Sequence, residues 1–254
     1  MNAAQEWKSH LQEWSIPEDI LQQAPESPWI HPPALFDLPQ VIEDGPSHRR
    51  AREVAPESVL DIGCGGGIAA FALTGTVTSV IGVDHQEEML TMFAKHAEDR
   101  RLHHQEILGD WPNVAEQTPK ADVVTCHHVA YNVQEIDPFI KALSYHANKR
   151  VVIEIPQRHP LSMSNAAWKH FWGIERPTKP QSEDLALVIK ECGFDARFEH
   201  WQSPLVRRAN MDDEVVFTRI RLCLPSSRDQ EIREFLESQS TPQTRAVTTI
   251  WWDV

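Results

Sequence analysis

The chain has 254 residues, of which 41% are hydrophobic and 24% charged, as in ordinary globular proteins. Its formal net charge of -13 argues against a partner bound mainly through phosphates, because such affinity needs neutralising Lys and Arg. No apolar run approaches the roughly 18 residues of a membrane span. The start lacks a signal-peptide pattern, and the four cysteines lack zinc or disulfide-framework spacing. These features predict a reduced, cytoplasmic protein that binds neither nucleic acid nor a membrane.

Residues 1–47 are rich in proline, holding seven of the 18 prolines. Trp7, Leu11 and Trp14 share one helical face, and Ser15 to Glu18 has the spacing of a capping box for a second short helix. The stretch 25–39 is expected to be extended or turning. Because so small a piece cannot bury its own core, residues 1–47 are expected to form a helical, Pro-rich cover on a main domain spanning 48–254.

From Ser58 onward, apolar strand patterns alternate with amphipathic helical patterns. This alternation predicts an α/β fold with a parallel sheet covered by helices on both faces. The run 214–224 is long and β-branched, which favours an edge or antiparallel strand, and 248–254 fits either a strand or a docking tail. The expected strands are 58–62, 79–84, 104–108, 121–126, 150–155 and 195–201, and the expected helices are 86–100, 138–148 and 182–194.

A glycine loop joins the first expected strand to the helix after it, reading Asp61-Ile62-Gly63-Cys64-Gly65-Gly66-Gly67. Such a loop lets the backbone approach a ligand closely and points helix N–H groups at it. A dinucleotide site requires G-x-G-x-x-G, but here Ile68 occupies the third glycine position. An acid before the loop suits a ligand with an amino group. The pattern therefore disfavours NAD.

This stretch resembles motif I of the Rossmann-like (class I) S-adenosylmethionine (SAM) methyltransferases, and the resemblance covers roughly residues 47–155. It implies a doubly wound, mostly parallel sheet of seven strands with the last antiparallel, and SAM as cofactor with S-adenosylhomocysteine as product. Asp84 then matches the acid on the ribose, Asp110 the contact to the adenine amino group, and Trp111 a ring that stacks on adenine. The expected cofactor residues are Asp61, Gly63, Cys64, Gly65, Gly67, Asp84, His85, Asp110, Trp111 and His127.

Three residues follow the fourth expected strand, where ligands collect in open parallel sheets. His127, His128 and Tyr131 are the candidate catalytic residues, because a weakly acidic acceptor needs a base to take its proton and histidine titrates near neutral pH. The alternative is that one histidine packs or contacts the cofactor. No metal site is expected, since no second cluster has ligand spacing.

The segment 156–180 is too long for an ordinary connection, and such insertions often carry function. It is locally basic, with Arg158, Lys169, Arg176 and Lys179 against Glu175 alone. Trp168 and Trp172 lie on one face of a short helix expected to end at Gly173. Arg158, His159, Trp168 and Trp172 are therefore candidate substrate-binding residues for a small anionic, partly apolar acceptor. The alternative is that the tryptophans cover the sheet and the charges are solvated.

Subclass signatures narrow the acceptor further. The N/D-P-P-Y/F signature of amino-directed nucleic-acid enzymes is missing after the fourth strand, and Cys126 follows Thr125 rather than the proline of cytosine C5 enzymes. With the acidic charge, this favours a methyltransferase acting on oxygen or nitrogen of a small molecule. The alternatives are a protein-directed methyltransferase, a non-catalytic SAM-binding module or partner subunit, and a nicotinamide-dependent oxidoreductase. Residues 1–47 would serve as a lid over the cofactor. Just after them, Arg49 or Arg50 would contact the cofactor carboxylate, or these residues would lie on a solvated helix face.

Overall fold

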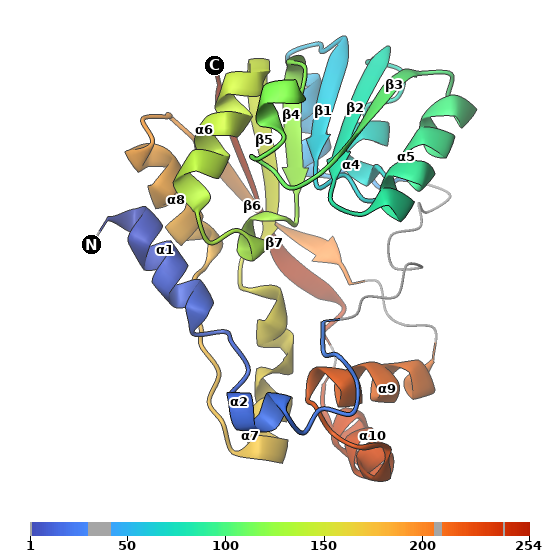
Figure 1. Ribbon diagram of the computed structural model, residues 1–254, viewed down its shortest axis with the longest axis vertical. Helices are drawn as coiled ribbons and strands as arrows, with labels where there is room; N and C mark the ends of the chain where they lie inside the picture. The colour runs from blue at the N-terminus through green and yellow to red at the C-terminus, as the bar shows by residue number, and fades with distance from the viewer. Residues whose placement is uncertain (1, 30–41, 206–209, 241) are drawn as a thin grey trace.

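The computed structural model describes residues 2–29, 42–205, 210–240 and 242–254. These residues form one sheet of seven strands in the order β3-β2-β1-β4-β5-β7-β6 (Figure 1). The pairs among β1 to β5 are parallel, and β7 runs antiparallel to both β5 and β6. The expected doubly wound, mostly parallel fold is confirmed. The strands are β1 Ser58–Ile62, β2 Ser79–Asp84, β3 His103–Leu108, β4 Ala121–His127, β5 Ala147–Pro156, β6 Arg197–Pro204 and β7 Thr244–Asp253.

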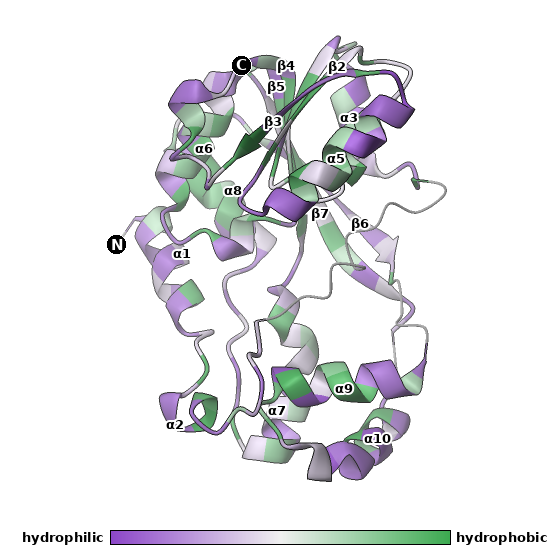
Figure 2. Cartoon of the chain, turned by 45° about the vertical axis from the view of Figure 1, so that its right-hand side comes forward, coloured by the Kyte–Doolittle hydropathy of each residue, from purple (hydrophilic) through white to green (hydrophobic). Residues whose placement is uncertain are grey.

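Helices cover both faces of this sheet, and two separate apolar clusters fill the space beneath them. The central strands are buried along most of their length, and runs of apolar residues show in green along them (Figure 2), as expected for parallel strands covered on both sides. One face carries α1 Ala3–Gln12, α6 Ile136–His146 and α8 Ser182–Glu191, and the other carries α3 Pro46–Arg52, α4 Ile68–Phe71 and α5 Glu87–Asp99.

A third apolar cluster lies beyond the carboxyl end of β5, beneath the sheet in Figure 1. Three parts of the chain that are far apart in sequence supply its helices. We call this helical layer the cap. Its helices are α2 Glu18–Leu21, α7 Asn165–Trp172, α9 Met211–Arg221 and α10 Asp229–Ser238.

The N-terminal segment reaches both the sheet domain and the cap. The Trp7 indole donates a hydrogen bond to the Val133 carbonyl (2.9 Å), and its ring stacks on Tyr131 at 5.5 Å. Trp14 stacks on His159 at 4.2 Å. The boundary expected at residue 47 falls inside α3, so the last residues of this segment belong to a helix that packs on β5 and β7.

One expected strand is wrong. Residues 214–224 belong mostly to helix α9, not to a sheet edge. The Asn210 side chain caps this helix by accepting from the Asp213 amide (2.9 Å), and acidic residues in the first turn complement the helix dipole. Packing of Val215 and Leu222 in the cap cluster then overrides the β-propensity of the branched residues. The seventh strand is instead β7, which contains 248–253.

One smaller expectation differs as well, and another falls mostly outside the described residues. Helix α2 begins at Glu18 after Pro17, without a side-chain cap, so the predicted capping box at Ser15 does not form. Most of the stretch 25–39 lies outside the described residues. Among the residues that are described, no helix has the length and apolar character needed to cross a membrane.

Candidate functional site

The glycine loop is built mainly by the backbone. Amides of Gly63 and Cys64 both donate to the Val83 carbonyl, at 2.8 and 3.1 Å, so the loop is tied across to β2. Gly67 begins α4 with φ +92°, and a Cβ there would lie 2.1 Å from Phe71. A Cβ on Gly63 (φ +66°) would lie 2.4 Å from Val129. These positions require glycine for both backbone conformation and space.

Asp84 ends β2 beside this loop and is buried. One carboxylate oxygen accepts from the Gly65 amide (3.0 Å), and the other accepts from the Gln86 amide (3.0 Å). Each oxygen keeps a further lone pair. The arrangement fixes an acceptor of hydrogen bonds at the edge of the loop, as expected for a residue that contacts ribose hydroxyls.

Asp61 lies beneath the same loop, 1% exposed. One carboxylate oxygen accepts from the Thr125 hydroxyl (2.9 Å), whereas the other is buried without a hydrogen-bond partner among the described residues. Burial raises the pKa of Asp61 to about 7. A positively charged amino group nearby would stabilise the carboxylate, so the Asp61 carboxylate fits the amino group at the amino-acid end of SAM.

The remaining cofactor candidates are less closely grouped. The Cys64 thiol is buried, and burial raises its pKa, whereas His85 and Asp110 are exposed. The Trp111 ring packs edge-on against His146, the last residue of α6, at 4.9 Å. That contact gives the indole a partner within the protein, so stacking on adenine stays a prediction for this residue.

The acceptor side of the site lies at the carboxyl ends of β4 and β5. The Nε2 atom of His127 is buried without a partner among the described residues, and burial lowers the pKa of His127 to about 3. His128 adopts φ +63°, rare for a residue other than glycine, and is partly exposed. The Tyr131 hydroxyl donates to the Pro156 carbonyl (3.0 Å), and burial raises the pKa of that hydroxyl. The histidines thus lie together at this edge, whereas Tyr131 faces the core.

Glu154 of β5 is at the centre of a polar cluster that the sequence did not reveal. Its carboxylate accepts from the Ser47 hydroxyl (2.6 Å) and lies 3.2 Å from Nε2 of His128. These partners lower the pKa of Glu154 despite its burial. Arg245 of β7 approaches the same His128 nitrogen at 3.2 Å. A charge within the otherwise apolar run 151–155 was the available signal for Glu154, but nothing in the sequence pairs it with Ser47 or Arg245.

The insertion 156–180 places its aromatic residues in the cap. Trp168 is buried in the cap cluster, and the Trp172 indole donates to the Leu222 carbonyl (2.8 Å). His159 is buried against Trp14, and its pKa is lowered to about 4 by burial and by Arg176. Arg158 is exposed and pairs through its backbone with Gln181. The two tryptophans therefore have structural partners, but these lie in the cap and not on the sheet that the alternative interpretation expected them to cover.

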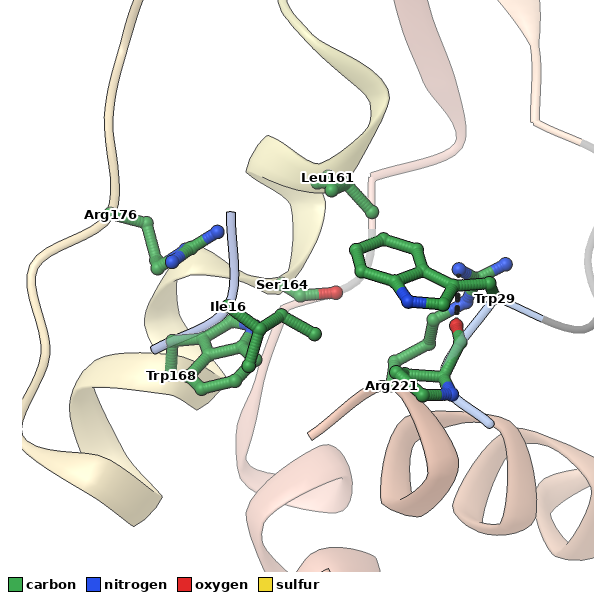
Figure 3. Close-up of a pocket in the computed structure, with 8 residues that line it drawn as sticks. Ile16, Trp29, Leu161, Ser164, Trp168, Arg176 and Arg221 are labelled. Carbon is green, nitrogen blue, oxygen red and sulfur yellow. Dashed lines mark hydrogen bonds between the residues drawn. The ribbon is translucent and has the colours of Figure 1, made fainter. Parts of the chain in front are cut away.

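The cations of the insertion are also engaged. Arg176 is 9% exposed and donates to the carbonyls of Trp14 and Ser15, while Lys169 pairs with Glu175. A pocket beside Arg176, between α7 and Trp29 (Figure 3), has room of about 10 Å³, roughly that of one water molecule. The predicted anion site in this insertion is not favoured by these contacts.

Two roles were open for Arg49 and Arg50, a contact to the cofactor carboxylate or a solvated helix face. Arg49 is exposed and lies 3.9 Å from Asp44. Arg50 pairs with Glu53 and Glu199 and stacks over Trp251 at 4.4 Å. These partners favour the second role.

A groove of about 470 Å³ runs between α8 and β6. It lies four strands away from β1, so it is not the cofactor site.

Within the described ranges, no group of three or more His, Cys, Asp or Glu side chains is arranged to hold a metal ion.

Comparison with known proteins agrees with the glycine loop. Residues 59–149 match the family model of a methyltransferase domain. The chain is 34% identical over 105 residues to an uncharacterized protein of Haemophilus influenzae, covering 41% of this chain and 39% of that one. It is 35% identical over 89 residues to the ubiquinone biosynthesis O-methyltransferase of Leptothrix cholodnii, covering 34% and 37%. The chain thus spans less than two fifths of the length of these relatives.

Solved structures share the fold. The YcgJ protein of Bacillus subtilis superposes with a TM-score of 0.55 at 17% identity, covering 81% of this chain and 95% of that one. TehB of Haemophilus influenzae gives 0.52 at 17% identity, covering 83% and 62%. Residues 59–149 thus match a methyltransferase domain, and the described sheet has the fold of these solved structures.

Proposed function

We propose that this protein transfers the methyl group of SAM to an oxygen or nitrogen atom of a small molecule. One observation carries the proposal. The glycine loop with Asp61 and Asp84 lies at the same sheet edge as the histidines and Glu154, because β1 pairs with both β2 and β4, and β4 pairs with β5. A donor site and a proton-accepting site thus adjoin.

When bound, SAM supplies a methyl group on a positively charged sulfur that leaves as a neutral thioether. Asp84 accepts hydrogen bonds from ribose hydroxyls, Asp61 holds the amino group, and Gly63, Gly65 and Gly67 admit the backbone close to the ligand. The protein's main contribution is to position the two reactants, because an in-line displacement depends on alignment.

The histidines supply the proton acceptor. The low pKa of His127 keeps its imidazole neutral at physiological pH, the form that accepts a proton. Burial lowers the pKa of both His48 and His127, and the Glu154 carboxylate opposes part of that lowering, so its negative charge favours the imidazolium formed after proton transfer. A protic O–H or N–H acceptor suits this environment.

Radiolabelled transfer tests the proposal. We expect label from methyl-tritiated SAM to pass to low-molecular-weight hydroxyl or amine compounds, and transfer at subsaturating SAM to fall in the Asp84→Ala variant. Glu87→Ala, an exposed change in the first turn of α5, is the matched control and retains transfer. Label that appears only in macromolecules would favour a protein-directed enzyme, and SAM binding without transfer to any class would favour a non-catalytic module.

A further inference from the structure

A third histidine faces the candidate acceptor site from α3. The His48 ring of α3 stacks on the His127 ring of β4, with centroids 5.6 Å apart. The Nε2 atoms of both rings are buried and have no hydrogen-bond partner among the described residues. Buried polar atoms without partners are costly and uncommon in folded proteins. Two of them in adjacent rings at the end of β4 therefore point to a ligand group that completes their hydrogen bonding.

The contacts of His48 define which of its nitrogens is a base. Its Nδ1 lies 3.1 Å from the Glu43 carbonyl oxygen. Because a carbonyl only accepts, Nδ1 carries the hydrogen in this contact. The Gly45 amide has two acceptors within reach, the Glu43 carbonyl at 3.1 Å and Nδ1 of His48 at 3.3 Å. We assign the hydrogen of His48 to Nδ1, donating to the Glu43 carbonyl, with the Gly45 amide donating to that same carbonyl; this assignment leaves Nε2 with a free lone pair.

A chain of hydrogen bonds makes Glu154 an anion next to this pair. The Trp201 indole donates to the Thr249 hydroxyl (3.2 Å), which lies 2.7 Å from the Ser47 hydroxyl. Ser47 in turn donates to the Glu154 carboxylate (2.6 Å). Because each group in this series donates toward Glu154, the Glu154 carboxylate acts only as an acceptor. Its charge disfavours a second carboxylate nearby and stabilises a protonated imidazole.

The position of His48 is held by ion pairs at the other end of its helix. Arg150, buried on β5, donates to the Arg50 carbonyl (2.8 Å) and to the Glu53 carboxylate (2.8 Å). It also pairs with Asp253 of β7. Helix α3 is thus fixed on the sheet, which presents His48 in one orientation, as a reacting group requires.

We propose that His48 is a catalytic base of this site and that the methyl acceptor is a neutral molecule with a hydroxyl group. The inference rests on the proposed function and deepens it. The hydroxyl proton passes to Nε2 of His48 while the oxygen forms a bond to the methyl carbon. The carbon–sulfur bond breaks with its electron pair on sulfur, and the proton later leaves to water. A hydroxyl needs such a base because it is a poor nucleophile when protonated.

Nitrogen-15 NMR of histidine-labelled full-length protein tests the proton assignment without any turnover. We expect Nε2 of His48 to give the resonance of an unprotonated nitrogen. In the presence of S-adenosylhomocysteine, catechol shifts this resonance and benzoate does not. A protonated Nε2, or a catechol shift confined to His128, would overturn the proposal. Calorimetry with S-adenosylhomocysteine tests the proposed function separately, since loss of that binding refutes the cofactor site and leaves the state of His48 measurable.

Three variants separate structure, binding and proton transfer. His48→Asn keeps a donor toward the Glu43 carbonyl but removes Nε2, and His48→Gln places an uncharged amide near Nε2. His104→Gln, on β3, is the matched control. With catechol as acceptor we expect His48→Asn to lose about 100-fold in kcat with S-adenosylhomocysteine affinity unchanged. His48→Gln should retain the KM for catechol but lose the rise of kcat with pH.

His48→Asn with control-like kcat would show that the residue only holds the turn before α3, and would overturn the proposal. The same conclusion would follow if His48→Gln kept the pH profile of the unchanged protein. Thermal unfolding of each variant accompanies these measurements. If His48→Asn does not fold, the His48→Gln profile decides alone.

Discussion

The two halves of the site are made in different ways. The cofactor half is formed mainly by the backbone of the glycine loop, whose amides donate to the Val83 carbonyl. Two aspartates at the ends of adjacent strands complete it. The acceptor half consists of side chains brought from α3, β4, β5 and β7, with Glu154 among them. Backbone geometry tolerates no added volume, whereas a side-chain cluster responds to pH and to the loss of single hydrogen bonds. The two halves should therefore fail in different ways.

The largest effect is expected at Gly67 of the glycine loop, for which Gly75, outside the loop, is a matched control. Gly67 and Gly75 both have φ +92°, but a Cβ on Gly67 meets Phe71 at 2.1 Å while one on Gly75 meets nothing within 4 Å. Gly75→Ala should cost about 1–2 kcal/mol of unfolding free energy through backbone conformation alone. Gly67→Ala should cost about 2 kcal/mol more through overpacking and should abolish SAM binding. Equal losses in urea unfolding would show that space at Gly67 is unimportant.

The acceptor half should instead affect the free energy of unfolding at acidic pH. The folded-state pKa of His127, about 3, lies below its unfolded value of about 6.5. The unfolded chain therefore takes up the proton first, and stability falls as pH drops from about 6.5 toward 3, by up to about 1.4 kcal/mol per pH unit.

His127→Gln should remove this loss, so that its urea midpoint changes less than that of the unchanged protein between pH 7 and pH 4.5. His104→Gln on β3 is the control and should follow the unchanged protein. Identical slopes for His127→Gln and the unchanged protein would contradict the burial of a neutral imidazole at this position.

Asp84→Ala tests the cofactor half at a side chain. It removes the acceptor of the Gly65 and Gln86 amides and the proposed contact to ribose. We expect SAM binding to weaken by about 1–3 kcal/mol in calorimetry, as for hydrogen bonds to a charged group. Glu87→Ala, an exposed change in the first turn of α5, should change affinity little. Unchanged affinity in Asp84→Ala would refute the placement of the ribose.

The smallest effect is expected for Tyr131→Phe. This change removes only the hydroxyl that donates to the Pro156 carbonyl, so unfolding free energy should fall by about 1 kcal/mol while methyl transfer stays within twofold. A large loss of transfer rate at unchanged stability would restore Tyr131 as a catalytic residue.

The same contrast explains what could be predicted from the sequence. Asp61, the loop glycines and Asp84 lie within 24 consecutive residues at strand ends, so spacing alone places them together. Ser47 and Glu154 are 107 residues apart, and only tertiary packing joins them. In the same way, the β-branched run 214–224 becomes a helix because an Asn cap and burial in the cap decide its conformation. The insertion 156–180 looked like a binding segment because its cations have no visible partners in sequence, yet Arg176 is satisfied by carbonyls of Trp14 and Ser15.

The most direct test of the account is calorimetric titration of the purified protein with SAM, S-adenosylhomocysteine and NAD under identical conditions. The glycine loop with an acid before it and Ile68 in place of the third glycine predicts binding of SAM and S-adenosylhomocysteine, and none of NAD. Binding of NAD without SAM would contradict the central claim, and so would the absence of heat with both sulfur compounds.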